Sequence, residues 1–206
     1  MEPFTKATGI VAPLDRVNVD TDSIVPARFL KRIEREGWGE TLFFDWRFLP
    51  DGRPNPEFIL NAPGYEDASI LVVGRNFGSG SSREHAVWAI QQYGFDAVVS
   101  PRFADIFRNN CTKNGLVPVQ VSAEFGADLM RAVQADPALE ITIDVERLTI
   151  EAPAAGLEST FPLDGGTRER FLQGLDDIGL TFRHIDAIDD FEKSRPDWMP
   201  IASSSR

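Results

Sequence analysis

A glycine-rich turn that ends in two serines and an arginine is the stretch of this sequence best suited to chemistry. It runs from Gly74 to Arg83. Glycines permit positive φ angles and let the backbone approach a small molecule closely. The helix predicted from Ser82 onward presents free N–H groups and a partial positive charge at its start. Because Arg83 adds a planar cationic fork suited to a carboxylate or phosphate, we predict a site for a small anion.

The same residues also have a purely structural interpretation. Ser81 and Glu84 stand three positions apart, which is the spacing of a capping box at the start of a helix. In that case Ser81 contributes about 1 kcal/mol to stability, and Arg83 is a solvated surface charge. The residue types and their spacing leave both interpretations open.

Three common motifs do not fit this turn. A P-loop needs Gly-Lys-Ser/Thr at the start of the helix, and the turn contains no lysine. A dinucleotide-binding fingerprint that begins at Gly78 and Gly80 needs a third glycine where Arg83 stands. The Gly-x-Ser-x-Gly spacing of a hydrolase nucleophile elbow is also missing. If the turn binds an anion, it therefore does so without any of these three motifs.

A buried strand and an amphipathic helix position the turn. Residues 70–73 form a continuous aliphatic run, typical of a strand buried on both faces. Further strands at 97–100 and 116–121, with a helix at 103–110 between them, indicate parallel pairing. The remaining expected elements are a strand within 4–13, a helix at 124–134, strands at 140–145, 147–152 and 159–163, and helices at 167–175 and 178–193.

The C-terminal region carries an apolar stripe on its last predicted helix. Such a stripe usually marks a core face, so we predict that it packs against the rest of the chain. We expect residues 1–194 to form a single domain and residues 195–206, which contain two prolines and three serines, to be a mobile tail. The stripe consists of Ile178, Phe182, Ile185, Ile188 and Phe191.

Composition excludes several classes of function. The formal net charge of −11 argues against nucleic acid or an anionic membrane as the main partner. No apolar run approaches the ~20 residues that a membrane span needs. Residues 1–10 lack the basic and apolar segments of a secretion signal. Together with a single cysteine, which fits a reducing compartment, these features predict a cytoplasmic protein.

The metal-ligating residues are too few for a cofactor site. One cysteine cannot hold an iron–sulfur cluster, and the two histidines, His85 and His184, lie too far apart for zinc-type spacing. We therefore expect no metal or cofactor on this chain. If the reaction needs a metal, a partner must bring it.

Four stretches match a known pattern in the same order along the chain. They are residues 78–86, which read Gly-Ser-Gly-Ser-Ser-Arg-Glu-His-Ala, residues 18–31, residues 103–116 and residues 174–181. The pattern resembles the swivelling domain of the aconitase superfamily and, within it, the family of 3-isopropylmalate dehydratase small subunits. One departure is Ser79, where many relatives have cysteine.

This resemblance implies a fold and an activity. The expected fold is α/β, an aconitase-type swivelling β/β/α domain with a mixed, partly parallel sheet flanked by helices. The implied reaction is a reversible dehydration and rehydration that interconverts 2-isopropylmalate and 3-isopropylmalate in leucine biosynthesis. The implied partner is a large subunit that carries a [4Fe–4S] cluster, so this chain is expected to be active only in the complex.

The resemblance also assigns roles near the turn. Ser81 takes the position of the catalytic base, and Ser82 and Arg83 take those of groups that hold a carboxylate of the small dicarboxylate substrate. Thr21 and Asp22 belong to a segment that helps to order the substrate-binding arginine.

The loop at residues 27–35 is implied to contact the variable side chain of the substrate. Leu30 would contact an isopropyl group, and Lys31 or Arg32 a carboxylate. Alternatively, Leu30 anchors the loop to the core and the basic pair is solvated.

Two other functions remain open at this point. The chain could be the small subunit of a related hydro-lyase of the citramalate, homoaconitate or dimethylmalate type. It could instead be a non-catalytic, anion-binding regulatory domain with the same fold, although the presence of Ser81, Ser82 and Arg83 together weighs against this. An RNA-binding role is disfavoured by the net charge of −11.

Overall fold

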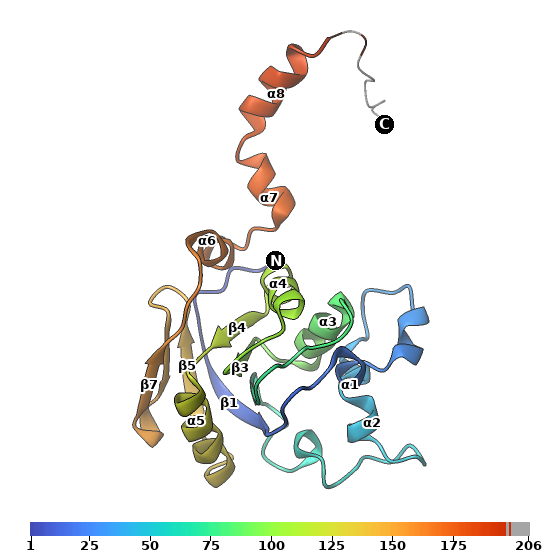
Figure 1. The fold of residues 1–206 in the computed structure, drawn as a ribbon, viewed down its shortest axis with the longest axis vertical. Helices are drawn as coiled ribbons and strands as arrows, with labels where there is room; N and C mark the ends of the chain where they lie inside the picture. The colour runs from blue at the N-terminus through green and yellow to red at the C-terminus, as the bar shows by residue number, and fades with distance from the viewer. Residues whose placement is uncertain (197, 199–206) are drawn as a thin grey trace.

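A seven-stranded mixed sheet organises the chain (Figure 1). The computed structural model describes residues 1–196 and 198. The strand order is β4-β3-β2-β1-β5-β6-β7. The strands are β1 (Lys6–Leu14), β2 (Ile70–Val73), β3 (Ala97–Ser100), β4 (Val117–Gln120), β5 (Glu140–Asp144), β6 (Thr149–Ala152) and β7 (Leu157–Thr160).

Strand β1 joins a parallel half of the sheet to an antiparallel half. It pairs parallel with β2, and β3 and β4 continue that half. On its other side it pairs antiparallel with β5, which begins a meander through β6 and β7. The expected mixed, partly parallel sheet is therefore confirmed, as is the hairpin of β5 and β6.

Helices cover both faces of the sheet. On one face lie α3 (Glu84–Tyr93) and α4 (Asp105–Asn114), and on the other lie α5 (Ala123–Ala135) and α6 (Gly165–Gln173). Short elements complete the chain: α1 (Thr21–Ile24), α2 (Phe44–Arg47) and the 3-10 helices η1 (Ala27–Lys31), η2 (Gly39–Thr41), η3 (Ile59–Asn61) and η4 (Pro153–Ala155).

The residues of β2 explain why two cores form. Leu71 and Val73 pack into the core beneath α3 and α4, whereas Ile70 and Val72 pack into the core beneath α5 and α6. Successive side chains of a strand point to opposite faces, so a strand covered on both sides must be apolar throughout. This strand ends directly before the glycine-rich turn and gives it a rigid base.

The last predicted helix is in fact two helices, α7 (Asp177–Phe182) and α8 (Ile185–Lys193). They form a C-terminal arm that projects away from the sheet (Figure 1). The prediction that their apolar stripe is a core face is wrong, since Ile178, Phe182 and Phe191 are 64%, 62% and 64% exposed. Helical periodicity reveals that one side is apolar but not what covers that side. Of the expected mobile tail, residues 197 and 199–206 lie outside the described residues.

Across the described residues, no helix combines the length and the apolar character needed to cross a membrane.

Gly78 is a position at which the turn tolerates no side chain. Its φ is +77°, and a Cβ would lie 2.2 Å from Cγ of Phe107. We expect Gly78→Ala to lower the free energy of unfolding by about 2–5 kcal/mol, because backbone strain and overpacking add. Gly52→Ala is the control, since Gly52 has a φ of +83° but nothing within 4 Å of the added Cβ. Denaturant unfolding measures both; equal losses would contradict the steric clash.

Candidate active site at the glycine-rich turn

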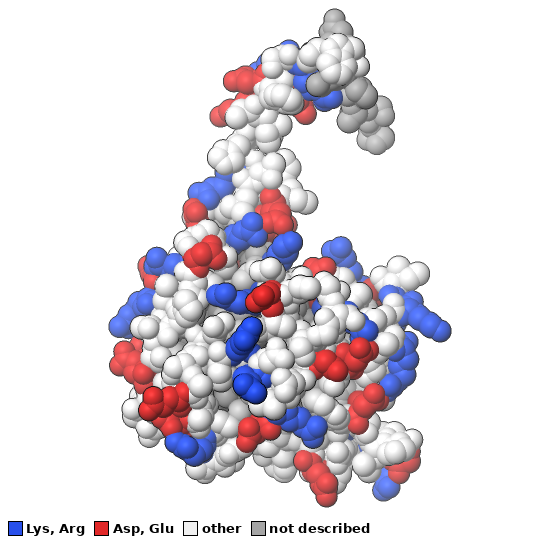
Figure 2. Space-filling view, in the orientation of Figure 1, with Lys and Arg blue, Asp and Glu red and all other residues white. Residues whose placement is uncertain are grey.

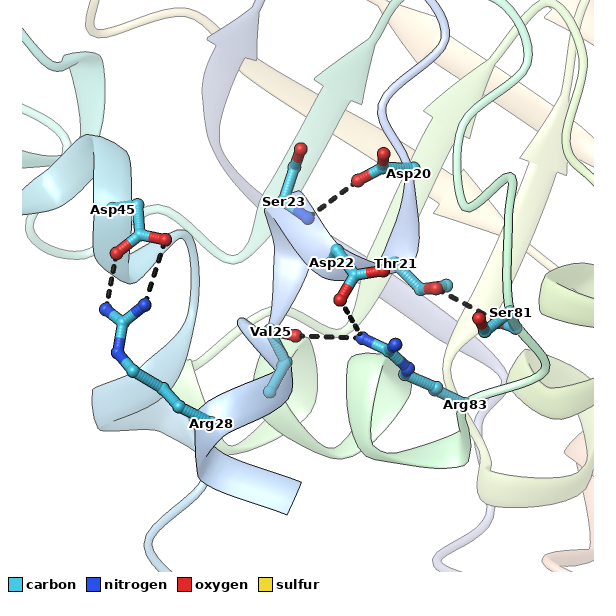
Figure 3. A network of polar contacts seen from close by, with 9 residues as sticks. All are labelled: Asp20, Thr21, Asp22, Ser23, Val25, Arg28, Asp45, Ser81 and Arg83. Atoms are coloured by element: carbon cyan, nitrogen blue, oxygen red, sulfur yellow. Dashed lines mark hydrogen bonds and ion pairs between the residues drawn. The ribbon is translucent and has the colours of Figure 1, made fainter. Parts of the chain in front are cut away.

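The backbone of the turn is fastened to the segment that precedes α1. The N–H of Gly78 donates to the carbonyl of Val19 at 2.8 Å, and the N–H of Thr21 donates to the carbonyl of Ser79 at 2.8 Å. The Thr21 hydroxyl, which is almost fully buried, also donates to the carbonyl of Ser81 at 3.0 Å. These bonds fix the path of the turn up to the two serines. Figure 3 shows the bond between Thr21 and Ser81.

Asp20 and Asp22, on either side of Thr21, have different partners. Asp20 is the N-cap of α1, where its carboxylate accepts from the N–H of Ser23 at 2.7 Å. Asp22 turns outward from α1 toward the Arg83 side chain (Figure 3). One acidic residue therefore shapes the short helix, and the other is available to an arginine.

The Arg83 guanidinium is held at one of its nitrogens. Nη1 donates to Oδ1 of Asp22 at 2.5 Å and to the carbonyl of Val25 at 3.5 Å (Figure 3). The Arg83 side chain is only 15% exposed, whereas that of Asp22 is 53% exposed. Among the described residues, Nε and Nη2 of Arg83 have no hydrogen-bond partner. The arginine is thus oriented by this chain, and part of its fork remains available to an anion.

Of the two interpretations of Ser81, the capping box with Glu84 is wrong. Helix α3 begins at Glu84 with Arg83 as its N-cap, and Arg83 is extended, with φ −122° and ψ 108°. The carboxylate of Glu84 instead accepts from the side-chain amide of Asn114 at 2.8 Å. The Ser81 hydroxyl is exposed and forms no hydrogen bond with any other described residue. Ser81 therefore does not cap α3, and the structure contradicts the interpretation of this serine as a helix cap.

His85 has a packing role directly after the turn. Its ring packs against two indoles, with centroid distances of 4.5 Å to Trp38 and 4.8 Å to Trp88. Desolvation by burial is the main cause that lowers the pKa of His85 below its ordinary value. The imidazole is consequently neutral near pH 7 and adds no charge to the site.

The segment at residues 30–32 is placed differently from the turn. Leu30 packs against the core beneath α3, Lys31 is exposed, and Nη1 of Arg32 donates to the carbonyl of Gly37 at 3.2 Å. Within the described part of the chain, no hydrogen bond or ion pair joins these three residues to residues 81–83. Among the described residues, hydrogen bonds and an ion pair therefore join Thr21 and Asp22 to the turn, but none joins Leu30, Lys31 or Arg32 to residues 81–83.

Two contacts near the site have no signal in the sequence. The carbonyl of Val25 lies 58 residues before its donor Arg83. Arg28 pairs through two nitrogens with the carboxylate of Asp45 and so holds η1 against α2 (Figure 3). That hydrogen bonding lowers the pKa of Asp45. Both contacts depend on tertiary packing, which cannot be predicted from the periodicity or the local spacing of the sequence.

The residues present do not fit a metal centre. In the described ranges, no group of three or more His, Cys, Asp or Glu could hold a metal ion. Burial raises the pKa of the Cys111 thiol well above its ordinary value, which disfavours the thiolate that a metal would require.

Comparisons with known proteins agree with the fold and identify the family. A family model described as the aconitase C-terminal domain matches residues 1–124, and one described as the C-terminal domain of the 3-isopropylmalate dehydratase small subunit matches residues 177–200. A crystal structure of 3-isopropylmalate dehydratase from Methanocaldococcus jannaschii, 22% identical, matches with a TM-score of 0.65 over 90% of this chain and 99% of that chain.

Relatives with much higher sequence identity carry the same name. The 3-isopropylmalate dehydratase small subunit of Frankia casuarinae is 57% identical over 98% of this chain and 100% of its own length. That of Koribacter versatilis is 55% identical over 94% of this chain and 99% of its own length. The chain belongs to the family of 3-isopropylmalate dehydratase small subunits.

Proposed function

We propose that this chain works as the small subunit of a hydro-lyase that interconverts 2-isopropylmalate and 3-isopropylmalate in leucine biosynthesis. The observation that carries the proposal is the arrangement of Arg83 and Ser81. Asp22 orients the Arg83 guanidinium but leaves some of its N–H groups without a partner among the described residues. Ser81, two residues earlier, is exposed, and its hydroxyl forms no hydrogen bond with any other described residue. The names of the relatives favour isopropylmalate over citramalate, homoaconitate or dimethylmalate.

Ser81 is proposed as the base. Dehydration of such a substrate requires removal of a proton from a carbon next to a carboxylate, and a positioned side chain must accept it. A serine hydroxyl is a poor base in water, so an alkoxide at Ser81 needs nearby positive charge and exclusion of water. The Arg83 guanidinium can supply the charge. Because Ser81 is exposed in this chain, another surface must close over it.

Arg83 and Ser82 are proposed to hold a carboxylate of the substrate. The N–H groups of Arg83 that Asp22 leaves free can donate to one carboxylate in the planar geometry that guanidinium groups favour. Ser82, the residue before Arg83, is exposed and can donate through its hydroxyl. Thr21 supports this arrangement through the Ser81 carbonyl, and Asp22 supports it by fixing the arginine.

The segment with Leu30, Lys31 and Arg32 is proposed to contact the isopropyl group and a distal carboxylate. Its support is position: η1 begins at Ala27, two residues after the Val25 carbonyl that Arg83 contacts. Since no hydrogen bond or ion pair joins residues 30–32 to residues 81–83 within the described chain, substrate or the partner is proposed to connect them.

The Lewis acid is proposed to come from a large subunit with a [4Fe–4S] cluster. This chain has one cysteine, which is buried, and cannot provide the thiolates that such a cluster needs. When bound, the cluster would supply the acid that the departing hydroxyl requires. The proposed role of this chain is to accept the proton and to bind the carboxylates and the isopropyl group of the substrate.

Anaerobic turnover of 2-isopropylmalate tests the proposal. The chain alone should be inactive, and mixing with the large subunit from the same source should restore turnover through an unsaturated intermediate. If a mixture with a demonstrably intact cluster converts a related hydroxy-diacid but not isopropylmalate, the substrate is wrong. If it converts neither while the two chains associate, the regulatory alternative replaces the enzymatic one.

A further inference from the structure

The C-terminal arm of α7 and α8 presents apolar side chains to solvent. On α7, Ile178 and Phe182 are four positions apart and so share one side of the helix. On α8, Ile185, Ile188 and Phe191 follow at intervals of three, and Phe191 is 64% exposed. Uncharged surface covers much of the arm in Figure 2. Short helices are marginal in water unless an apolar face is buried, so the arm requires a surface to pack against.

Two ion pairs join α7, the first helix of the arm, to α6. Asp177 at the start of α7 pairs with Arg170 of α6 at 2.6 Å, and Arg183 after the end of α7 pairs with Glu169 of α6 at 2.8 Å. Both pairs are partly exposed and contribute little stability, but together they tie α7 to α6 through polar groups. Ile178 and Phe182 remain largely solvent-exposed in this arrangement.

Charge limits what can cover the arm. Residues 177–193 contain five acidic and two basic residues, a net charge of −3, and the whole chain carries −11. A second copy of this chain, or a fold-back of the arm onto the body, would therefore bring acidic surface to acidic surface, and like charges close together cost free energy. The complementary surface is an apolar groove flanked by lysine or arginine side chains.

The arm and residues 1–124 are matched by two different family models. The aconitase C-terminal domain model covers residues 1–124, whereas the model specific to dehydratase small subunits covers residues 177–200 and thus the arm. The model that matches the arm is therefore named for proteins that are subunits of a larger enzyme. This favours the large subunit as its occupant.

We propose that the arm docks its apolar stripe into a groove with basic flanks on the large subunit, in the manner of an amphipathic helix in a groove. This rests on the proposed function, which supplies the large subunit. Phe182 and Phe191 are the anchors, since aromatic side chains carry much of the binding free energy in such contacts. The arm attaches the two chains to each other, and the turn at residues 74–83 supplies the chemistry.

The full-length double variant Phe182→Ser with Phe191→Ser tests this docking. Its Kd for the cluster-bearing large subunit, measured by sedimentation at fixed salt, should rise about 100-fold, as expected for the loss of two anchors. Turnover should return at saturating large subunit, because the turn is untouched. The matched control is Asp186→Asn with Asp190→Asn, on the opposite side of α8, whose Kd should stay within about threefold of wild type.

The outcomes separate the docking from the catalytic proposal. An unchanged Kd in the aromatic variant, with wild-type turnover, overturns the docking alone. Loss of self-association in that variant, with an unchanged Kd for the large subunit, identifies a second copy as the occupant and also overturns it. A raised Kd in a complex whose wild-type form has no isopropylmalate turnover supports the docking and contradicts the proposed function.

Discussion

Replacing Ser81 with alanine is expected to lower kcat by about 1,000-fold or more, because a positioned base contributes roughly 10²–10⁴-fold to a proton transfer. The folded state should hardly change. The Ser81 hydroxyl is exposed, bonds to no other described residue and does not cap α3, so its removal leaves no buried polar group unpaired. Anaerobic single-turnover kinetics with saturating large subunit measures the chemical step directly.

The control for this variant is Ser79→Ala in the same turn. Ser79 is half-buried and contributes its backbone carbonyl to Thr21, which alanine preserves, so kcat should stay within a few-fold of wild type. Thermal unfolding and titration with the large subunit accompany both variants. If Ser81→Ala loses stability and association in parallel with activity, the serine is structural and the assignment of the base fails.

The sheet and its flanking helices could be predicted from the sequence because their signals are local. Strands β2 and β3 are short, mainly apolar and fully buried runs, and residues 70–73 contribute side chains to both cores. The alternation of such runs with helical periodicity is sufficient to indicate parallel pairing. The hairpin of β5 and β6 follows from two adjacent alternating segments.

The start of α3 could not be predicted in the same way. The Ser81 and Glu84 spacing satisfies the capping-box rule, yet tertiary contacts hold the preceding backbone extended. Thr21 fastens the Ser81 carbonyl, and Asp22 fastens the Arg83 side chain 61 residues away. Local propensity gives way where long-range contacts fix the chain. This departure from the local rule lies at the candidate active site, as expected where function constrains the backbone.

What covers the apolar stripe of the arm could not be predicted from the sequence, for a different reason. The stripe from Ile178 to Phe191 correctly indicates amphipathic helices, but periodicity has the same form whether the covering surface is the chain's own core or another protein. The break at Arg183 and His184 is also weakly encoded, since neither residue is a glycine or proline. Only the exposure of these side chains in the folded chain distinguishes the two cases.

Arg83→Ala is the second substitution with a large expected effect, a fall in kcat/KM of about 1,000-fold. Truncating one partner of a desolvated charge pair costs roughly 2–5 kcal/mol, and the substrate carboxylate would lose its only proposed cationic contact on this turn. Stability should change little, because the Asp22 carboxylate left behind is 53% exposed and stays hydrated. Steady-state kinetics of the reconstituted complex checks this result.

Two milder variants decide whether Arg83 acts on the substrate or only pairs with Asp22. Arg83→Lys keeps the charge but loses the fork, so kcat/KM should fall about 30-fold, chiefly through KM, as for loss of a charge-assisted hydrogen bond of about 2 kcal/mol. Asp22→Asn retains an acceptor at the position that contacts Nη1, so KM should rise only about fivefold. KM is therefore expected to be lowest for wild type, higher for Asp22→Asn and highest for Arg83→Lys. If both variants changed only thermal stability and left KM alone, the pair would be structural, and the carboxylate would have to be held by the large subunit.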